Sequence, residues 1–163
     1  MKKLAITLLL VNLAVLAASL PWLPEPVAVH FDGQGRPNGW MSQTVHALFM
    51  GLFILLMTGL FLALPALTGS RMDRWLNIPQ RDRWLSPSHR PRLEALLAGF
   101  GHRCAVLMGL FLLGIQGLLV LANQTSPARL NNTLTIILMV AFVVLILAAS
   151  LQLTWQLRHP DRH

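Results

Sequence analysis

Four long apolar runs separated by polar segments dominate the hydrophobic pattern of this chain. The runs are almost free of ionisable side chains and cover residues 4–20, 45–67, 104–122 and 134–155. A bilayer core about 30 Å thick requires roughly 20 apolar residues in a helix, so the first run is long enough when it extends to residue 23. No run shows the polar face of a surface helix in a soluble protein. Because a backbone in lipid must satisfy its own hydrogen bonds, the pattern predicts an all-α membrane protein. We expect a single membrane domain with four transmembrane helices, at about 4–23, 45–67, 104–122 and 134–155.

The distribution of basic residues predicts the orientation of these spans. Eleven of the thirteen Lys and Arg residues flank the spans on one side, namely Lys2, Lys3, seven arginines in the loop 68–103, Arg158 and Arg162. Arg36 and Arg129 are the two on the other side. The positive-inside rule places the larger group in the cytoplasm. We therefore expect a multi-pass protein of the bacterial inner membrane, with both termini cytoplasmic and a structured extracytoplasmic loop at 24–44.

The first apolar run has a second interpretation. Residues 1–19 combine two lysines, an apolar stretch and small residues at 17–19, which is also the pattern of a cleavable signal peptide. Cleavage would leave three spans and an extracytoplasmic N-terminus. The length of the run, and Pro21 just after the best cleavage position, favour a retained span. The intact mass of the purified protein distinguishes the two.

Composition agrees with a membrane protein. Only 12% of the residues are charged, about half the proportion found in soluble domains, although the formal net charge is +7. Topology explains this charge, so we expect the lipid bilayer as a partner and no nucleic acid. In the cytoplasmic loop, Trp75 and Trp84 with their flanking arginines suggest a segment lying on anionic headgroups. Residues 90–101 are expected to form a helix leading into the third span. The single Cys104 cannot form an internal disulfide.

Few polar groups interrupt the spans. Asn12 and Gln116 lie near the middle of the first and third spans, and we expect Asn12 to form hydrogen bonds between helices, with a role in transport as the alternative. Two pairs of small residues spaced four apart, Gly59 with Ala63 and Ala105 with Gly109, predict close helix packing, including packing within a homo-oligomer. The spans contain no Asp, Glu, Lys or Arg, which argues against a proton-coupled pump.

The outer loop has the signals of a folded hairpin. Residues 27–31 form a β-like run, and the Asp-Gly and Pro-Asn-Gly sequences at 32–39 favour turns. Trp40 is placed to anchor the chain at the interface. Ser42 or Thr44 is a candidate N-cap for the second span.

His30, Asp32 and His46 are the candidates for chemistry in this loop. His30 and Asp32 share a face of an extended run. Together with His46 they would suit zinc or another divalent metal. The structural alternative is that His30 hydrogen-bonds the loop backbone and packs it onto the helix ends. The chain has no nucleophile elbow, phosphate-binding loop or zinc-protease motif, so we expect no cofactor and no catalytic residue.

Two motifs resemble a known family. The sequence from Leu23 to Ser42 resembles the signature of the domain of unknown function numbered 1648, which accompanies SdpI-like bacterial membrane proteins. Residues 77–87 resemble a second element of that family, in which an aromatic residue commonly stands where this chain has Arg83. The resemblance implies a small multi-span inner-membrane protein. The member after which SdpI-like proteins are named gives immunity to a secreted peptide toxin and, in its induced state, sequesters a transcriptional repressor at the membrane. The resemblance also implies a recognition loop comprising His30, Phe31, Asp32, Gly35, Asn38 and Trp40, and a cytoplasmic element comprising Pro79, Asp82 and Trp84.

These observations lead to a functional hypothesis. We expect a non-enzymatic protein that senses, or gives resistance to, an extracytoplasmic peptide or envelope stress. Its outer loop would contact the ligand and its inner loop a cytoplasmic protein partner. The alternatives are a transporter or accessory subunit of a membrane complex, and a metal-dependent envelope enzyme.

Overall fold

The computed structural model of the protein describes residues 1–64 and 73–161. Residues 65–67, expected at the end of the second span, and Arg162 lie outside this part. Within it, four helices are long and apolar enough to cross a membrane. They are α1 (Lys2–Ser19, continued by the 3₁₀ turn Leu20–Trp22), α2 (Gln43–Ala63), α4 (Arg90–Asn123) and α5 (Asn132–Arg158). The described chain is therefore that of a multi-pass membrane protein.

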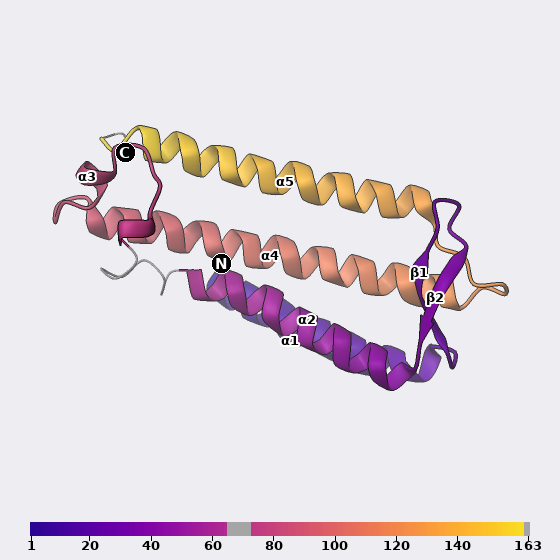
Figure 1. Cartoon of the computed structure of the whole chain (residues 1–163). Helices are drawn as coiled ribbons and strands as arrows, with labels where there is room; N and C mark the ends of the chain where they lie inside the picture. Colours follow the sequence, from indigo (N-terminus) through magenta and orange to yellow (C-terminus); the bar gives the residue numbers. More distant parts are fainter. Residues whose placement is uncertain (65–72, 162–163) are drawn as a thin grey trace.

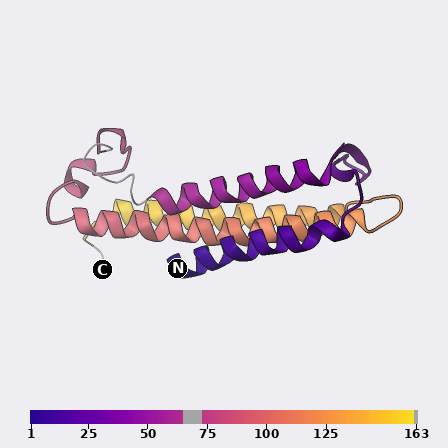
Figure 2. The ribbon, with the colours of Figure 1, turned by 90° about the horizontal axis from the view of Figure 1, so that it is seen from below.

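The helix α4 lies at the centre of the bundle. It packs against α1, α2 and α5, and α1 and α2 also pack against each other. The helix α5 packs mainly on α4, apart from the α1–α2 pair (Figures 1 and 2). We call the end with residues 20–43 and 124–131 the hairpin end, and the end with residues 73–103 and 157–161 the arginine end. The N-terminus lies toward the arginine end (Figure 1), as does Asp161, whose carboxylate bonds Arg83.

Small residues allow α1 and α4 to approach closely. Ala5 and Ala105 are fully buried in one cluster with Leu8. A Cβ added to Gly109 would lie 3.0 Å from the Cβ of Leu8. The Ala105–Gly109 pair therefore lies at a helix contact. By contrast, a Cβ on Gly59 would meet nothing within 4 Å, so that face of α2 is open.

The helix α5 exposes most of its apolar surface. Its buried residues are Ala149 and Leu157. Its contact with α4 includes Phe111 and Phe142, whose rings are stacked with centroids 4.4 Å apart. Such a helix would be unfavourable in water, but lipid tails can solvate its exposed side chains.

The helix α4 is longer than a bilayer core requires. At 1.5 Å per residue its 34 residues span about 51 Å, against a core of about 30 Å. The expected helix at 90–101 is confirmed as the first three turns of α4. At the arginine end, these turns pack with the short helix α3 (Arg81–Trp84) and with the end of α5, and Arg90 forms an ion pair at 2.8 Å with Asp73 of the short segment η3 (Asp73–Trp75).

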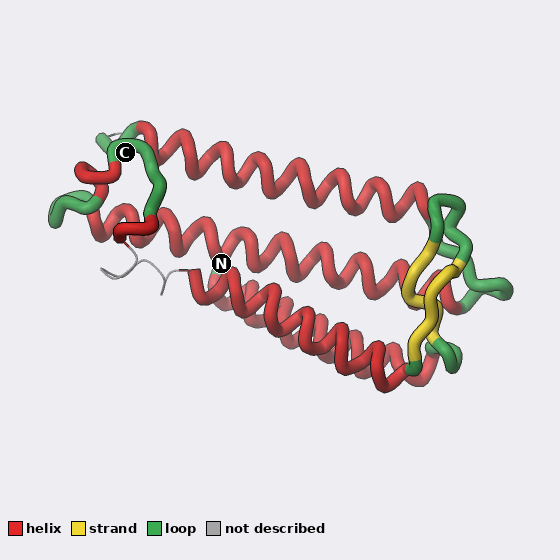
Figure 3. Tube along the Cα trace, viewed as in Figure 1, coloured by secondary structure: helices red, strands yellow, loops and turns green. Residues whose placement is uncertain are grey.

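A two-stranded antiparallel hairpin covers the opposite end (Figure 3). It consists of β1 (Val27–Phe31) and β2 (Pro37–Met41), with Val27 opposite Met41 and His30 opposite Gly39. The β-like run expected from the sequence is thus confirmed. Ser42 is the N-cap of α2, since its hydroxyl accepts a hydrogen bond from the Val45 amide at 3.2 Å.

Candidate ligand-binding site at the hairpin end

Asp32 organises the turn between the two strands. Its Oδ1 accepts hydrogen bonds from the amides of Gln34 and Arg36, each at 2.8 Å. The bond from Arg36 is the main cause of an Asp32 pKa below its ordinary value. The Asp-Gly sequence therefore forms a turn in which the ionised carboxylate is the acceptor.

Asn123, at the end of α4, joins the hairpin to the bundle. Its Oδ1 accepts from the Ala28 amide at 2.9 Å, and its Nδ2 donates to the Ala28 carbonyl, also at 2.9 Å. Ala28 is 1% exposed and Asn123 8%. One side chain thus satisfies both backbone groups of a buried strand residue, as a neighbouring strand would.

The tip of the hairpin is held against the segment between α4 and α5. The Leu130 amide donates to the Gly35 carbonyl at 2.9 Å, and Asn132 Nδ2 donates to the Gly33 carbonyl at 2.6 Å. Gly35 has φ +76°, and a Cβ there would lie 2.4 Å from the Leu130 carbonyl oxygen. Both the backbone conformation and the close contact therefore require glycine.

A pocket of about 580 Å³ lies where the hairpin tip, α4 and α5 meet. Its apolar lining comes from Leu118, Leu121, Ala122, Leu130 and Leu134, and its polar lining from Gln34, Thr125, Arg129, Asn131, Asn132 and Thr133. This volume and mixture are typical of sites for small molecules or peptide side chains. Within the described residues, no hydrogen bond or ion pair occupies the Arg129 guanidinium. The pocket thus offers an apolar wall and a cation for an anionic group.

The loop residues expected to contact a ligand lie in the hairpin, and several of them contact one another. The exposed His30 Nδ1 bonds the side chain of Asn38, rather than the loop backbone. Gly39 faces His30 closely, since an added Cβ would lie 2.9 Å from the Cβ of His30. Phe31 is half-buried, and Trp40 is 54% exposed on β2. Gln34, which is not among the residues expected to form the recognition loop, is the hairpin residue in the pocket.

The structure does not bring His30, Asp32 and His46 together as a metal site. Among the described residues there is no group of three or more His, Cys, Asp and Glu side chains that could hold a metal ion. His46 is 4% exposed on α2, whereas His30 is exposed on β1 and Asp32 is engaged in its turn. The alternation of side chains along a strand places His30 and Asp32 on one face, but it does not predict that His46 is buried in the helix bundle.

Asn12 and Gln116 form a buried polar pair between α1 and α4. Gln116 Nε2 donates to Asn12 Oδ1 at 2.8 Å, and Asn12 Nδ2 donates to the carbonyls of Leu8 and Gly109 at 2.8 and 3.0 Å. Asn12 is fully buried, so these bonds remove the cost of placing its amide in an apolar interior. Gln116 also lines an apolar groove with Val15, Ala18 and Gly117.

The structure at the arginine end contradicts the expectation that Trp84 lies on anionic headgroups. Trp84 does not lie on lipid headgroups, because it is fully buried and its Nε1 donates to the Leu157 carbonyl at 2.8 Å. It packs with Leu93 and Leu157 in a small core outside the long bundle. Amphipathic composition does not distinguish a headgroup anchor from a buried ring. Trp75 is 71% exposed, and Pro79 and Asp82 are exposed beside this core.

Residues far apart in the sequence form the pocket, and no sequence motif links them. Arg129 is one of the two basic residues on its side of the spans, and this position was the only sign in the sequence that it belongs to a site. Gln34 and Ala122, which both line the pocket, lie nearly 90 residues apart and carry no motif of their own.

Comparison with known protein families finds one region of the chain that matches a family model. Residues 7–55 match the family described as "Domain of unknown function (DUF1648)", which confirms the domain that the motif at residues 23–42 predicts. The matched region contains most of α1, the hairpin and the first half of α2. Neither a curated protein nor a solved structure matches the chain.

Proposed function

We propose that this protein is a non-enzymatic receptor or immunity protein of the bacterial inner membrane that binds an extracytoplasmic peptide in the pocket at its hairpin end. The observation that carries the proposal is the pocket itself, with apolar residues from α4 and α5 beside polar residues and Arg129. An amphipathic peptide with an acidic side chain or a terminal carboxylate matches this lining. The resemblance to SdpI-like proteins supports the same class of ligand.

The position of the pocket suggests how binding is transmitted. Its lining includes Leu121 of α4 and Leu134 of α5, and α5 packs mainly on α4. A ligand that binds one spacing of these helices better than another shifts the population of that spacing. The other end of α5 contacts α3 at the arginine end, through Trp84 and Leu157. In this proposal the arginine end faces the cytosol and responds to α5.

Replacement of Arg129 tests the proposal. A strain lacking the protein is complemented with the wild type, Arg129→Gln or Arg36→Gln, and challenged with a panel of envelope-active peptides. Loss of a charge-assisted hydrogen bond should raise the Kd about tenfold, and the protective effect should fall accordingly in Arg129→Gln. Arg36→Gln removes the same charge from the hairpin end outside the pocket and should protect like the wild type. Full protection by Arg129→Gln, or no protection by the wild type against any peptide, would contradict the proposal.

One observation favours the alternative of an accessory subunit. Gly59 and Ala63 lie on an open face of α2, and small residues on such a face suit contact with another transmembrane helix. A second membrane protein that copurifies in fixed stoichiometry, and is lost in Gly59→Leu, would support this function.

A further inference from the structure

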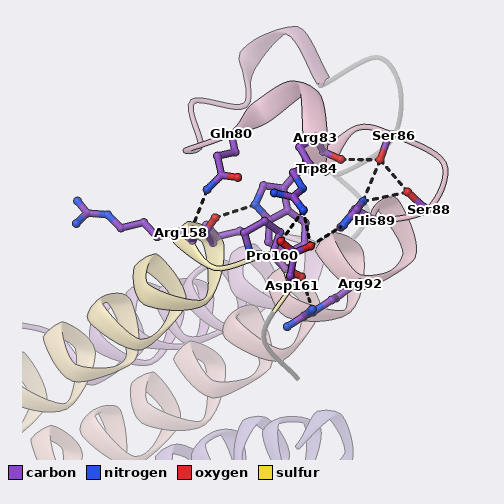
Figure 4. Close-up of polar contacts among 11 residues, drawn as sticks. Gln80, Arg83, Trp84, Ser86, Ser88, His89, Arg92, Arg158, Pro160 and Asp161 are labelled. Atoms are coloured by element: carbon purple, nitrogen blue, oxygen red, sulfur yellow. Dashed lines mark hydrogen bonds and ion pairs between the residues drawn. The ribbon is translucent and has the colours of Figure 1, made fainter.

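The segment 157–161, which comprises the last two residues of α5 and the three residues after it, is held by side chains from residues 80–84 and from the start of α4 (Figure 4). Trp84 Nε1 donates to the Leu157 carbonyl at 2.8 Å, and Gln80 Nε2 donates to the Arg158 carbonyl at 2.9 Å. Arg92 donates to the Pro160 carbonyl, and Arg83 Nη2 bonds both carboxylate oxygens of Asp161 at 2.5 Å. We call this set of contacts the tail clasp.

Two contacts of the tail clasp, Trp84 with Leu157 and Arg83 with Asp161, differ in their exposure to solvent. Trp84 is fully buried and Leu157 is 5% exposed, so their hydrogen bond is protected from water. The side chains of Arg83 and Asp161 are 47% and 62% exposed. Exposed ion pairs are screened by salt and contribute little to stability. The buried bond between Trp84 and Leu157 can therefore hold the end of α5 while the exposed ion pair between Arg83 and Asp161 breaks and re-forms.

The groups around Asp161 form a site for a carboxylate. His89 Nε2 lies 3.7 Å from Asp161 Oδ1. His89 Nδ1 lies within hydrogen-bond distance of the hydroxyls of Ser86 and Ser88, at 3.1 and 3.0 Å, which fixes the ring with Nε2 toward the carboxylate (Figure 4). A guanidinium beside an oriented imidazole is a suitable receptor for an acidic side chain. Asp161 shows the chemistry that the site accepts.

The distance of the site from the apolar runs favours a soluble partner over a lipid. His89 precedes Arg103, at the start of the third apolar run, by 14 residues, or about 21 Å along the helix. The headgroup layer on each side of a bilayer is only about 5–8 Å thick. A phospholipid headgroup at the level of Arg103 would therefore not reach Arg83 and His89.

We propose that Arg83 and His89 form a binding site for an acidic side chain of a soluble protein partner, and that Asp161 of the chain itself occupies this site until the partner displaces it. The inference rests on the proposed function only for the placement of the arginine end in the cytosol. Displacement would loosen residues 158–161, which Gln80 and Arg92 would still hold, while Trp84 holds Leu157. The tail clasp thus makes partner binding and loosening of the tail mutually dependent.

Binding of a labelled hexa-glutamate peptide to the purified full-length protein in detergent tests this proposal at low ionic strength. Asp161→Asn should bind the peptide about three- to fivefold more tightly than the wild type, because the competing carboxylate, which an exposed ion pair holds only weakly, is gone. Asp161→Glu should bind like the wild type. Asp82→Asn removes the same charge from a fully exposed side chain in α3 and should change nothing. Adding Arg83→Gln to Asp161→Asn should abolish the gain.

Two results would overturn the proposal: an equal gain in Asp161→Asn and Asp82→Asn, or a gain that survives Arg83→Gln. Hydrogen exchange of the unmodified protein provides a test that does not depend on a variant folding. Saturating hexa-glutamate should increase exchange at 158–161 and leave residues 27–41 unchanged, and binding without this increase also rejects the proposal. The expected changes depend on Asp161, Arg83 and exchange at 158–161, all at the arginine end, so failure of this proposal is separate from failure of the proposed function.

Discussion

At the level of single residues, Asn123 joins the hairpin of the candidate site to the helix bundle. The hairpin has only two strands, and an isolated hairpin is marginally stable in water. The Asn123 amide bonds both backbone groups of the buried Ala28 and thereby supplies a third partner from α4. Because Gln34 reaches the pocket only when the hairpin is docked, this contact also controls the ligand site.

Asn123→Ala should detach the hairpin from α4. The substitution leaves the buried N–H and C=O of Ala28 without a partner, at a cost of about 1–3 kcal/mol for each group. We expect a lower midpoint of thermal unfolding in detergent and faster hydrogen exchange at the Ala28 amide. In the matched variant Asn123→Asp, the carboxylate still accepts from the Ala28 amide but cannot donate, so exchange should be intermediate. Unchanged protection of this amide in Asn123→Ala would show that other contacts dock the hairpin.

At the scale of elements, the arginine end has its own small core. Three turns of α4, the short helix α3 and the end of α5 bury Trp84, Leu93 and Leu157 together. The last carbonyls of a helix lack partners within the helix, and here Trp84 and Gln80 supply donors to two of them. The short α3 is therefore stabilised by its role as a cap on α5.

Trp84→Phe separates the hydrogen bond of this cap from its packing. The ring remains, but the Leu157 carbonyl loses its donor, which should cost about 1–2 kcal/mol of unfolding free energy. Trp84→Ala should cost about 3–5 kcal/mol, because it also leaves a cavity. Trp22→Phe is the control, since Trp22 is 71% exposed at the opposite end. Denaturant unfolding measured in detergent gives the three values, and a loss in Trp22→Phe equal to that in Trp84→Phe would contradict a specific cap.

At the scale of the whole molecule, an even number of long helices places both ends of the described chain toward the arginine end. The hairpin, its pocket and Arg129 lie at the other end. Exposed apolar residues cover α5, so the surface between the two ends is suited to lipid. The molecule thus has two chemically different ends, which the proposed function connects through α4 and α5.

The orientation in the membrane is testable by labelling of single cysteines. In a Cys104→Ala background, Arg36→Cys reports on the hairpin end and Asp82→Cys on the arginine end, and both positions are exposed. The positive-inside rule predicts that a membrane-impermeant maleimide labels Arg36→Cys in spheroplasts and Asp82→Cys only after permeabilisation. The reverse pattern would place the pocket in the cytosol and reject the proposed function.

Much of the architecture could be predicted from the sequence because its causes are local. The length of an apolar run, the Asp-Gly turn at Asp32 and the Ser42 cap each depend on neighbouring residues. The helix at 90–101 and the strand at 27–31 belong to the same class. Trp84 was misplaced since its burial depends on Leu157, which is 73 residues away.

Hydropathy and turn chemistry add up along the chain, so the four apolar helices within the described residues, and the hairpin after the first of them, could be predicted from local sequence. Which polar groups meet depends instead on how the helices pack in three dimensions. The bond between Asn12 and Gln116, the docking of Ala28 on Asn123 and the pocket with Arg129 all depend on which helix faces turn toward each other. In helices that are apolar on all sides, periodicity does not mark the contact face, so side-chain packing and a few buried hydrogen bonds select it.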